Sequence, residues 1–150
     1  MFRLKDSSGG YWCLSDDNHL HTTSHCPSDY LTTKKHEFAL VTNTDNNDVP
    51  SGNCAIKFGY DNSFFKYTDK VVGDSGSSLS QSAYHFVATS VGNGKVNILS
   101  VDKNKYLKLD GHHAKATESS DCGNDCQFTV EEIEVAADNE PPESSGILIK

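Results

Sequence analysis

Short apolar strands of similar sequence recur three times along the chain. Each copy begins with an apolar strand, passes through a polar turn of Gly, Asn, Ser or Lys, and continues into a strand that starts with an aromatic residue and ends near an Asp. The first strands are expected at residues 2–5, 55–57 and 96–99, and the second strands at residues 11–16, 64–69 and 106–110. Apolar and polar residues alternate within them, as in a β-strand with one buried face. The repeat therefore predicts an all-β protein built from three similar units.

A closing strand completes each copy, at residues 37–41, 85–88 and 127–130, and a weaker third strand precedes it around residues 20, 71–72 and 114. From the aromatic that leads the second strand to the Phe of the closing strand there are 22 residues in copies two and three, but 27 in copy one. The excess indicates an insertion around residues 25–30. The copies span about residues 1–42, 53–92 and 95–134 and together predict twelve strands.

The architecture follows from the number of copies. Repeats of about 42 residues with four strands also form propeller blades, but three blades are too few to close a propeller. Three such units can instead close a six-stranded barrel capped by three hairpins, which is the β-trefoil. We expect little helix, at most one turn within residues 78–84. Residues 135–150 are acidic, contain prolines and have no strand pattern, so we expect a linker or tail there.

The charge of the chain narrows the choice of partners. The formal net charge is −8 and the pI is about 5.2. The basic residues are scattered, so nothing favours contact with phosphates, and we expect no nucleic-acid partner.

No apolar run is long enough to span a bilayer, and the charged N-terminal residues contain no apolar signal-peptide region. We therefore expect no membrane insertion and a cytoplasmic or non-classically released protein, with an extracellular processed form left open.

Five cysteines leave at least one thiol unpaired within a monomer. Cys122 and Cys126 are the closest pair, and they form either a small disulfide loop in an oxidising compartment or two reduced thiols beside a polar turn. Cys13 lies in a predicted strand and Cys54 begins another, so both are expected to be structural.

The repeat unit resembles that of the fascin and hisactophilin β-trefoils. The shared features are an apolar strand, a short turn, Tyr-Leu-x-Leu and a closing Phe-x-Val, and residues 96–130 match best within a resemblance that covers residues 2 to about 134. A looser similarity extends to the domains of amaranthin-type plant lectins. The Gln-x-Trp motif of ricin-type lectins does not occur, since Trp12 follows Tyr11. The resemblance implies a β-trefoil with glycan binding or actin crosslinking as its function, and protease inhibition is a third use of the fold.

The turn after the second strand is chemically rich in copies one and three. It reads Asp-Asp-Asn-His-Leu-His at residues 16–21 and Asp-Gly-His-His at residues 110–113, whereas copy two has no imidazole there. Carboxylates and imidazoles can hydrogen-bond sugar hydroxyls, and a nearby aromatic ring can pack on the apolar face of a sugar. The alternative is that Asp and Asn only form the turns and that the histidines lie on a solvated strand. The candidate carbohydrate-binding residues are Trp12, Asp16, Asp17, His19, His21, Asp110, His112 and His113, with Tyr30 and Tyr60 as other candidate aromatics.

Metal binding is less well supported by the sequence. His19 and His21 lie on one face of a predicted strand, but zinc needs four converging ligands and no Cys-x2-Cys pair accompanies them. Residues 45–48 offer oxygen ligands without the spacing of a calcium-binding EF-hand loop. We therefore assign no metal and no cofactor to this sequence.

These observations favour a binding protein over an enzyme. The sequence contains no nucleophile elbow, phosphate-binding loop or HExxH motif. We expect a non-enzymatic, lectin-like protein whose partners are glycans or glycoconjugates, made multivalent by a homo-oligomer or an attached second module. A fascin-like actin-binding module is the alternative, which the acidic charge disfavours because actin filaments are also acidic. An inhibitor would need a protruding loop, for which residues 25–30 are the candidate.

Overall fold

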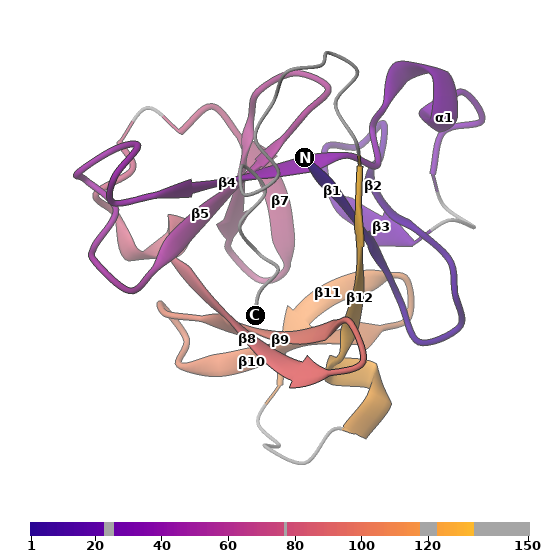
Figure 1. The fold of residues 1–150 in the computed structure, drawn as a ribbon. Coiled ribbons are helices and arrows are strands. Elements are labelled where there is room, and N and C mark those ends of the chain that lie inside the picture. Colours follow the sequence, from indigo (N-terminus) through magenta and orange to yellow (C-terminus); the bar gives the residue numbers. More distant parts are fainter. Residues whose placement is uncertain (23–25, 77, 118–122, 134–150) are drawn as a thin grey trace.

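A computed structural model describes residues 1–22, 26–76, 78–117 and 123–133. These residues form twelve strands and three short helices (Figure 1). The strands are β1 (Phe2–Lys5), β2 (Trp12–Leu14), β3 (Leu20–Thr22), β4 (Phe38–Thr42), β5 (Cys54–Phe58), β6 (Phe64–Tyr67), β7 (Val71–Asp74), β8 (Phe86–Gly92), β9 (Lys95–Ser100), β10 (Lys105–Asp110), β11 (His113–Ala116) and β12 (Phe128–Glu132). The helices are α1 (Tyr30–Thr33), η2 (Ser82–Tyr84) and η3 (Gly123–Cys126).

Six of the strands close a barrel. Strand β1 pairs with β4 and β12, β5 pairs with β4 and β8, and β9 pairs with β8 and β12, all antiparallel, so the ring has no free edge. The hairpins β2–β3, β6–β7 and β10–β11 supply the other six strands, one hairpin from each copy. This is the predicted β-trefoil of three four-stranded units, and the fold prediction is confirmed.

An aromatic core fills the barrel. Each closing strand begins with a buried phenylalanine: Phe38 in β4, Phe86 in β8 and Phe128 in β12. Phe65 of β6 lies between two of them, with ring centroids 5.5 Å from Phe38 and 6.0 Å from Phe86. Along β9, half-buried and buried residues alternate at every position, as the predicted period of two requires. The core draws on all three copies, so an isolated copy would expose most of its apolar face.

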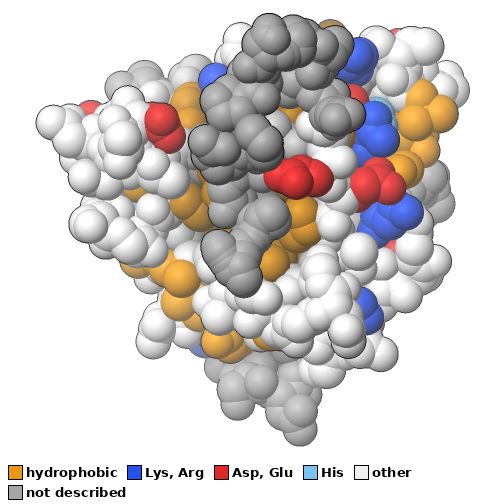
Figure 2. Space-filling model, viewed as in Figure 1, with side chains coloured by type: hydrophobic (Ala, Val, Ile, Leu, Met, Phe, Trp, Pro, Cys, Tyr) orange, Lys and Arg blue, Asp and Glu red, His pale blue; other side chains and the backbone are white. Residues whose placement is uncertain are grey.

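Charged side chains connect the first and last strands where the barrel closes. Arg3 of β1 contacts Glu37 at 3.1 Å and Glu131 of β12 at 3.3 Å. The Tyr11 hydroxyl donates a hydrogen bond of 2.7 Å to Glu131 and is the main cause of the lowered pKa of that carboxyl, followed by Arg3. Figure 2 shows acidic and basic side chains side by side on this face of the molecule. The network ties the ends of the described fold together.

Helix content differs from the sequence prediction in two places. The expected turn within residues 78–84 is present as η2, but α1 in the copy-one insertion and η3 before β12 were not predicted. Helix α1 has four residues and buries none of them, so it leaves no apolar periodicity in the sequence. The structure therefore corrects the expectation of a single helical turn.

The copy-one insertion is fixed by a disulfide between Cys13 and Cys26. The sequence analysis did not pair these residues, because 13 positions separate them and only the fold brings β2 close to the insertion. Cys54 is a buried free thiol, and burial raises its pKa to about 12. Cys126 is disulfide-bonded, but Cys122 lies outside the described residues, so their predicted pairing stays a prediction.

Two further expectations concern the chain outside the barrel. None of the helices in the described ranges is long and apolar enough to cross a membrane. The predicted linker or tail at residues 135–150 lies outside the described residues, so this boundary stays a prediction.

Candidate functional site

The turns predicted as separate sites in copies one and three meet at the hairpin cap. Strand β3 pairs with β11, and His21 lies directly opposite His113 in this register. His19, just before β3, forms an isolated bridge with Val72 of β7. All three copies therefore contribute backbone to one place, because the three hairpins converge around the axis of the trefoil. We call His19, His21, His112 and His113 the histidine cluster.

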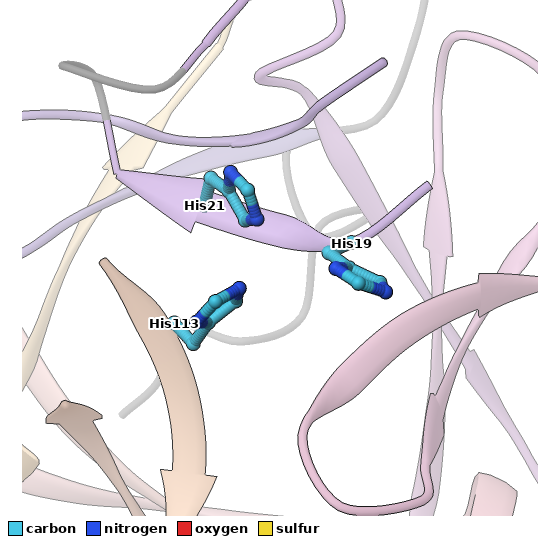
Figure 3. Close-up of side chains that lie close together, drawn as sticks. All are labelled: His19, His21 and His113. Carbon is cyan, nitrogen blue, oxygen red and sulfur yellow. The ribbon is translucent and has the colours of Figure 1, made fainter. Parts of the chain in front are cut away.

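The imidazoles of the histidine cluster are close enough to act together. His19, His21 and His113 each offer a ligand atom, and these three atoms all lie within 4.8 Å of one another. Figure 3 shows His21 on β3, His19 where the chain enters β3, and His113 on the facing strand β11, with the three side chains around the same space. The ring centroid of His113 lies 4.5 Å from that of His21 and 4.2 Å from that of His112. His21 is 5% exposed, so the cluster extends from the surface into the protein.

Asp17 supplies a carboxylate to the histidine cluster. Its Oδ2 lies 3.3 Å from Nδ1 of His19, and its Oδ1 lies 3.6 Å from Nε2 of His21. The Ser15 hydroxyl donates a hydrogen bond to the same carboxylate. Partial desolvation acts to raise the pKa of Asp17, but Ser15 and the two imidazoles together hold it below its ordinary value. Asp17 is therefore an anion beside the histidines.

His113 stays neutral at ordinary pH. Desolvation, then the positive fields of His21, His112, Lys70 and His19, lower its pKa to about 4. A neutral imidazole has one nitrogen with an available lone pair, so it can accept a hydrogen bond or bind a metal ion.

The backbone of the β2–β3 turn fixes the position of the copy-one histidines. Asn18 adopts a left-handed conformation with φ of 68°, which asparagine tolerates better than most residues. Its side-chain amide donates to the carbonyl of Gly73 in β7 at 2.6 Å, and the Gly73 amide donates back to the Asn18 carbonyl at 2.9 Å. A Cβ on Gly73 would lie 2.9 Å from Asn18 Oδ1, so glycine permits this close approach. Copy two has no imidazole here, but its strand β7 holds the β2–β3 turn in place through these two hydrogen bonds.

Trp12 does not belong to an exposed site. It is 1% exposed, and its ring centroid lies 5.5 Å from that of Phe128 in the core. The interpretation of Trp12 as the aromatic that packs on a sugar is therefore wrong, because its ring faces are covered. All three residues of β2 are buried, so the position of Trp12 within a strand is the signal that could have excluded it. Tyr30 is half-buried, with its ring 5.2 Å from His36.

Asp16 and Asp110 lie on the surface with lysine partners. The Asp16 side chain is 83% exposed, and its Oδ1 lies 3.6 Å from Nζ of Lys35. Asp110 lies 3.9 Å from Nζ of Lys115 and is also well exposed. Neither carboxylate is among the groups that converge with the three histidines.

Asp16 is connected to an exposed aromatic residue of the next copy. Nζ of Lys35 lies 4.7 Å from the ring centroid of Tyr60, in the turn between β5 and β6. We call Asp16, Lys35 and Tyr60 the Tyr60 surface. Tyr60 was one of three candidate aromatics in the sequence, but Lys35 was missed. No sequence pattern could have indicated Lys35, because its contact with Tyr60 joins copies one and two and depends on the fold.

Acid is expected to destabilise the protein through His113. Its pKa is about 4 in the fold against 6.5 for a free imidazole, so the unfolded chain takes up the proton first. The contribution of His113 to the free energy of unfolding is therefore fully present above about pH 6.5. It is lost as the pH falls to about 4, and the loss is on the order of 1–2 kcal/mol for a half-buried group. Urea unfolding at about pH 7.5 and about pH 5 measures the change. His113→Gln should lose less on acidification, and an equal loss would assign the effect to other groups.

No family model and no curated protein matches the sequence. Solved structures do match in fold. The designed three-fold symmetric protein ThreeFoil has a TM-score of 0.67 at 13% identity, over 88% of this chain and 98% of its own. SeviL bound to asialo-GM1 saccharide has a TM-score of 0.65 at 14% identity, over 89% and 97%. These neighbours and the strand topology define a β-trefoil.

Enzymes also contain a similar domain. A GlcNAcα1-4Gal-releasing endo-β-galactosidase from Clostridium perfringens matches with a TM-score of 0.71 at 8% identity, over 89% of this chain but 32% of the enzyme. An exo-β-1,3-galactanase from Clostridium thermocellum matches over 30% of its length. The neighbours thus include a saccharide-bound protein and glycosidases, and at these identities they establish the fold alone.

Proposed function

We propose that the protein is a non-enzymatic carbohydrate-binding domain and that it binds glycans at the Tyr60 surface. The observation that carries this proposal is the exposure of Tyr60. Among the described residues it is the only Phe, Tyr or Trp with high exposure, at 47%. Exposure of an aromatic ring to water is unfavourable, and a ligand that covers the ring removes this cost. The C–H face of a sugar has a suitable shape and polarity to do so.

The neighbours of Tyr60 suit the polar side of a sugar. Asp16 accepts hydrogen bonds and Lys35 donates them, so the two can pair with adjacent hydroxyl groups. The Lys35 side chain is only 12% exposed, so its ammonium is held in place beside the ring and Asp16. The turn that holds Tyr60 is also ordered by Asp61, whose carboxylate accepts from the backbone amide of Ser63 at 3.0 Å and from its hydroxyl at 2.7 Å.

The comparisons support binding over catalysis. A protein of similar fold and similar length is described as bound to a saccharide. The two glycosidases are about three times as long as the region they share with this chain, so the similar domain is a minor part of each. A single shallow site binds sugars weakly, and we therefore propose that a homo-oligomer or an attached second module makes binding multivalent.

Copy three offers a second candidate site. Asp110 is exposed at the end of β10, and His112 is half-buried two residues later. These groups can hydrogen-bond a sugar hydroxyl, but no exposed aromatic residue of the described chain accompanies them. We propose this turn as the weaker of the two sites.

A glycan array tests the proposed function. The labelled full chain, applied at high concentration, should be retained on a limited set of glycans. Tyr60→Ala should weaken retention of the best glycan by at least about tenfold, because the stacking surface is lost. Tyr60→Phe should retain most of the binding, and Asp16→Asn should weaken it several-fold. Asp110→Asn with His112→Gln tests the copy-three turn separately.

The control is Val91→Ala, which shortens another exposed apolar side chain, in the β8–β9 hairpin. It should leave glycan retention unchanged. Retention on no glycan would remove the proposed function, and co-sedimentation with actin filaments would then favour the fascin-like alternative. Glycan binding that survives Tyr60→Ala would instead move the site away from the Tyr60 surface.

A further inference from the structure

The histidine cluster has a geometry that sugar binding does not require. His21 lies in β3, His19 lies just before this strand, and His113 faces His21 across the β3–β11 pair. The two strands come from copies one and three, which the closed barrel holds in fixed register. The three imidazoles therefore form a triangle on a rigid part of the fold.

The triangle is nearly the size of a metal site. Three atoms that lie within 4.8 Å of one another share a centre no more than about 2.8 Å from each. Zinc binds imidazole nitrogen at about 2.0–2.1 Å, so each nitrogen needs to approach the centre by less than about 0.8 Å. A small rotation about the side-chain torsions supplies such a shift without any change in the backbone. Imidazole is a suitable ligand for zinc, copper and nickel ions, whereas calcium and magnesium ions favour oxygen ligands.

The charges around the triangle favour a cation. Asp17 lies beside His19 and His21 and carries a negative charge. Lys70 is a nearby positive charge that would repel a bound cation. Its ammonium pairs with Asp69 at 3.5 Å, which reduces this repulsion.

We propose that His19, His21 and His113 bind one divalent transition metal ion of the zinc class, with Asp17 next to the ion as its carboxylate partner. The ion joins the hairpins of copies one and three. The proposal does not depend on sugar binding, since the Tyr60 surface shares no residue with this site. It departs from the sequence analysis, which assigned no metal because it placed only His19 and His21 together as possible ligands.

Zinc titration of the untagged full chain tests the proposal. After treatment with a chelator, isothermal titration calorimetry without sugar should give one ion per chain with a Kd in the low micromolar range or tighter. Cobalt(II) should give the visible absorption of a tetrahedral site. The melting temperature should rise with zinc concentration, because the ion binds only the folded arrangement of the two hairpins. A Cys54→Ala background removes the free thiol as a competing ligand.

His112 provides a matched control inside the histidine cluster. His19→Gln and His113→Gln should each weaken zinc binding by at least about thirtyfold, since each removes one ligand. His112→Gln should change the affinity by less than about threefold. His19 is partly exposed, so His19→Gln is the variant that leaves folding least affected, and circular dichroism checks this.

Three results would overturn the metal site. One is the absence of saturable binding at about 100 μM zinc. Another is zinc affinity that is unchanged in both His19→Gln and His113→Gln. A loss with His112→Gln as large as with His113→Gln would also overturn the assigned ligands. Each result is independent of the glycan array, so failure of the metal site and failure of the proposed function can be told apart.

Discussion

Phe65→Ala is expected to lower the free energy of unfolding by about 3–5 kcal/mol, the cost of truncating a fully buried phenylalanine. Phe65 is 0% exposed, and its ring contacts Phe38, Phe58 and Phe86. Removing the ring leaves a cavity among three other rings that belong to barrel strands, and a closed barrel can collapse into it only slightly. Urea unfolding followed by tryptophan fluorescence measures the loss, because Trp12 lies in the same core.

Phe64→Ala is the matched control, because it truncates the same residue type one position earlier in β6. Phe64 points to the opposite face of the strand and is only half-buried. It packs against the smaller cluster that contains Leu79 and Tyr84. The loss of stability should therefore be less than half of that for Phe65→Ala. Equal losses in the two variants would contradict the assignment of Phe65 to the centre of the core.

The fold could be predicted because the alternation of apolar and polar residues is a local pattern that the sequence repeats in all three copies. The period of two determines which residues point inward, and Phe38, Phe86 and Phe128 mark the same position in each copy. Three units of this kind have one compact way to close. Strands β3 and β11 were hardest to see in the sequence because they have only three and four residues and few large apolar side chains, with one leucine in β3 and two alanines in β11.

The candidate sites could be predicted only in part, because they form between copies. The sequence analysis named His19, His21 and His113, but it treated each turn as its own site. That β3 pairs with β11 follows from the closure of the three hairpins around one axis, which no single copy specifies. The same reason explains why Lys35 was missed, since its contact with Tyr60 crosses from copy one to copy two.

Trp12 illustrates the opposite error, in which chemistry was given more weight than position. A single tryptophan in a candidate lectin suggests a stacking residue, but Trp12 heads a strand whose three residues are all buried. Its ring contributes to the core instead. In a β-trefoil the loops between strands carry exposed groups, as the Tyr60 turn does, and strand residues are the poorer candidates.

Removal of the Cys13–Cys26 disulfide is expected to have the second largest effect on stability. The bond joins residues separated by 13 positions, and in the chain-entropy model a loop of this size stabilises the fold by about 3 kcal/mol. Cys13 lies in β2, paired with His21, so the bond also holds the insertion of copy one against the hairpin that carries the histidines. Cys13→Ala with Cys26→Ala should lower the free energy of unfolding by about this amount, measured by urea unfolding under oxidising conditions.

Reductant separates the disulfide from the packing of the two side chains. The intact protein should lose stability when reductant is added, whereas the double variant should lose less, because only the bond that involves Cys126 remains to be reduced. Cys54→Ala is the control, since this thiol is free, and its response to reductant should equal that of the intact protein. If the double variant were as stable as the intact protein in oxidising buffer, the copy-one insertion would be held by its other contacts. The contacts to test would then be two backbone hydrogen bonds, one donated by the Lys35 amide to the Tyr30 carbonyl and one donated by the Leu14 amide to the Lys35 carbonyl.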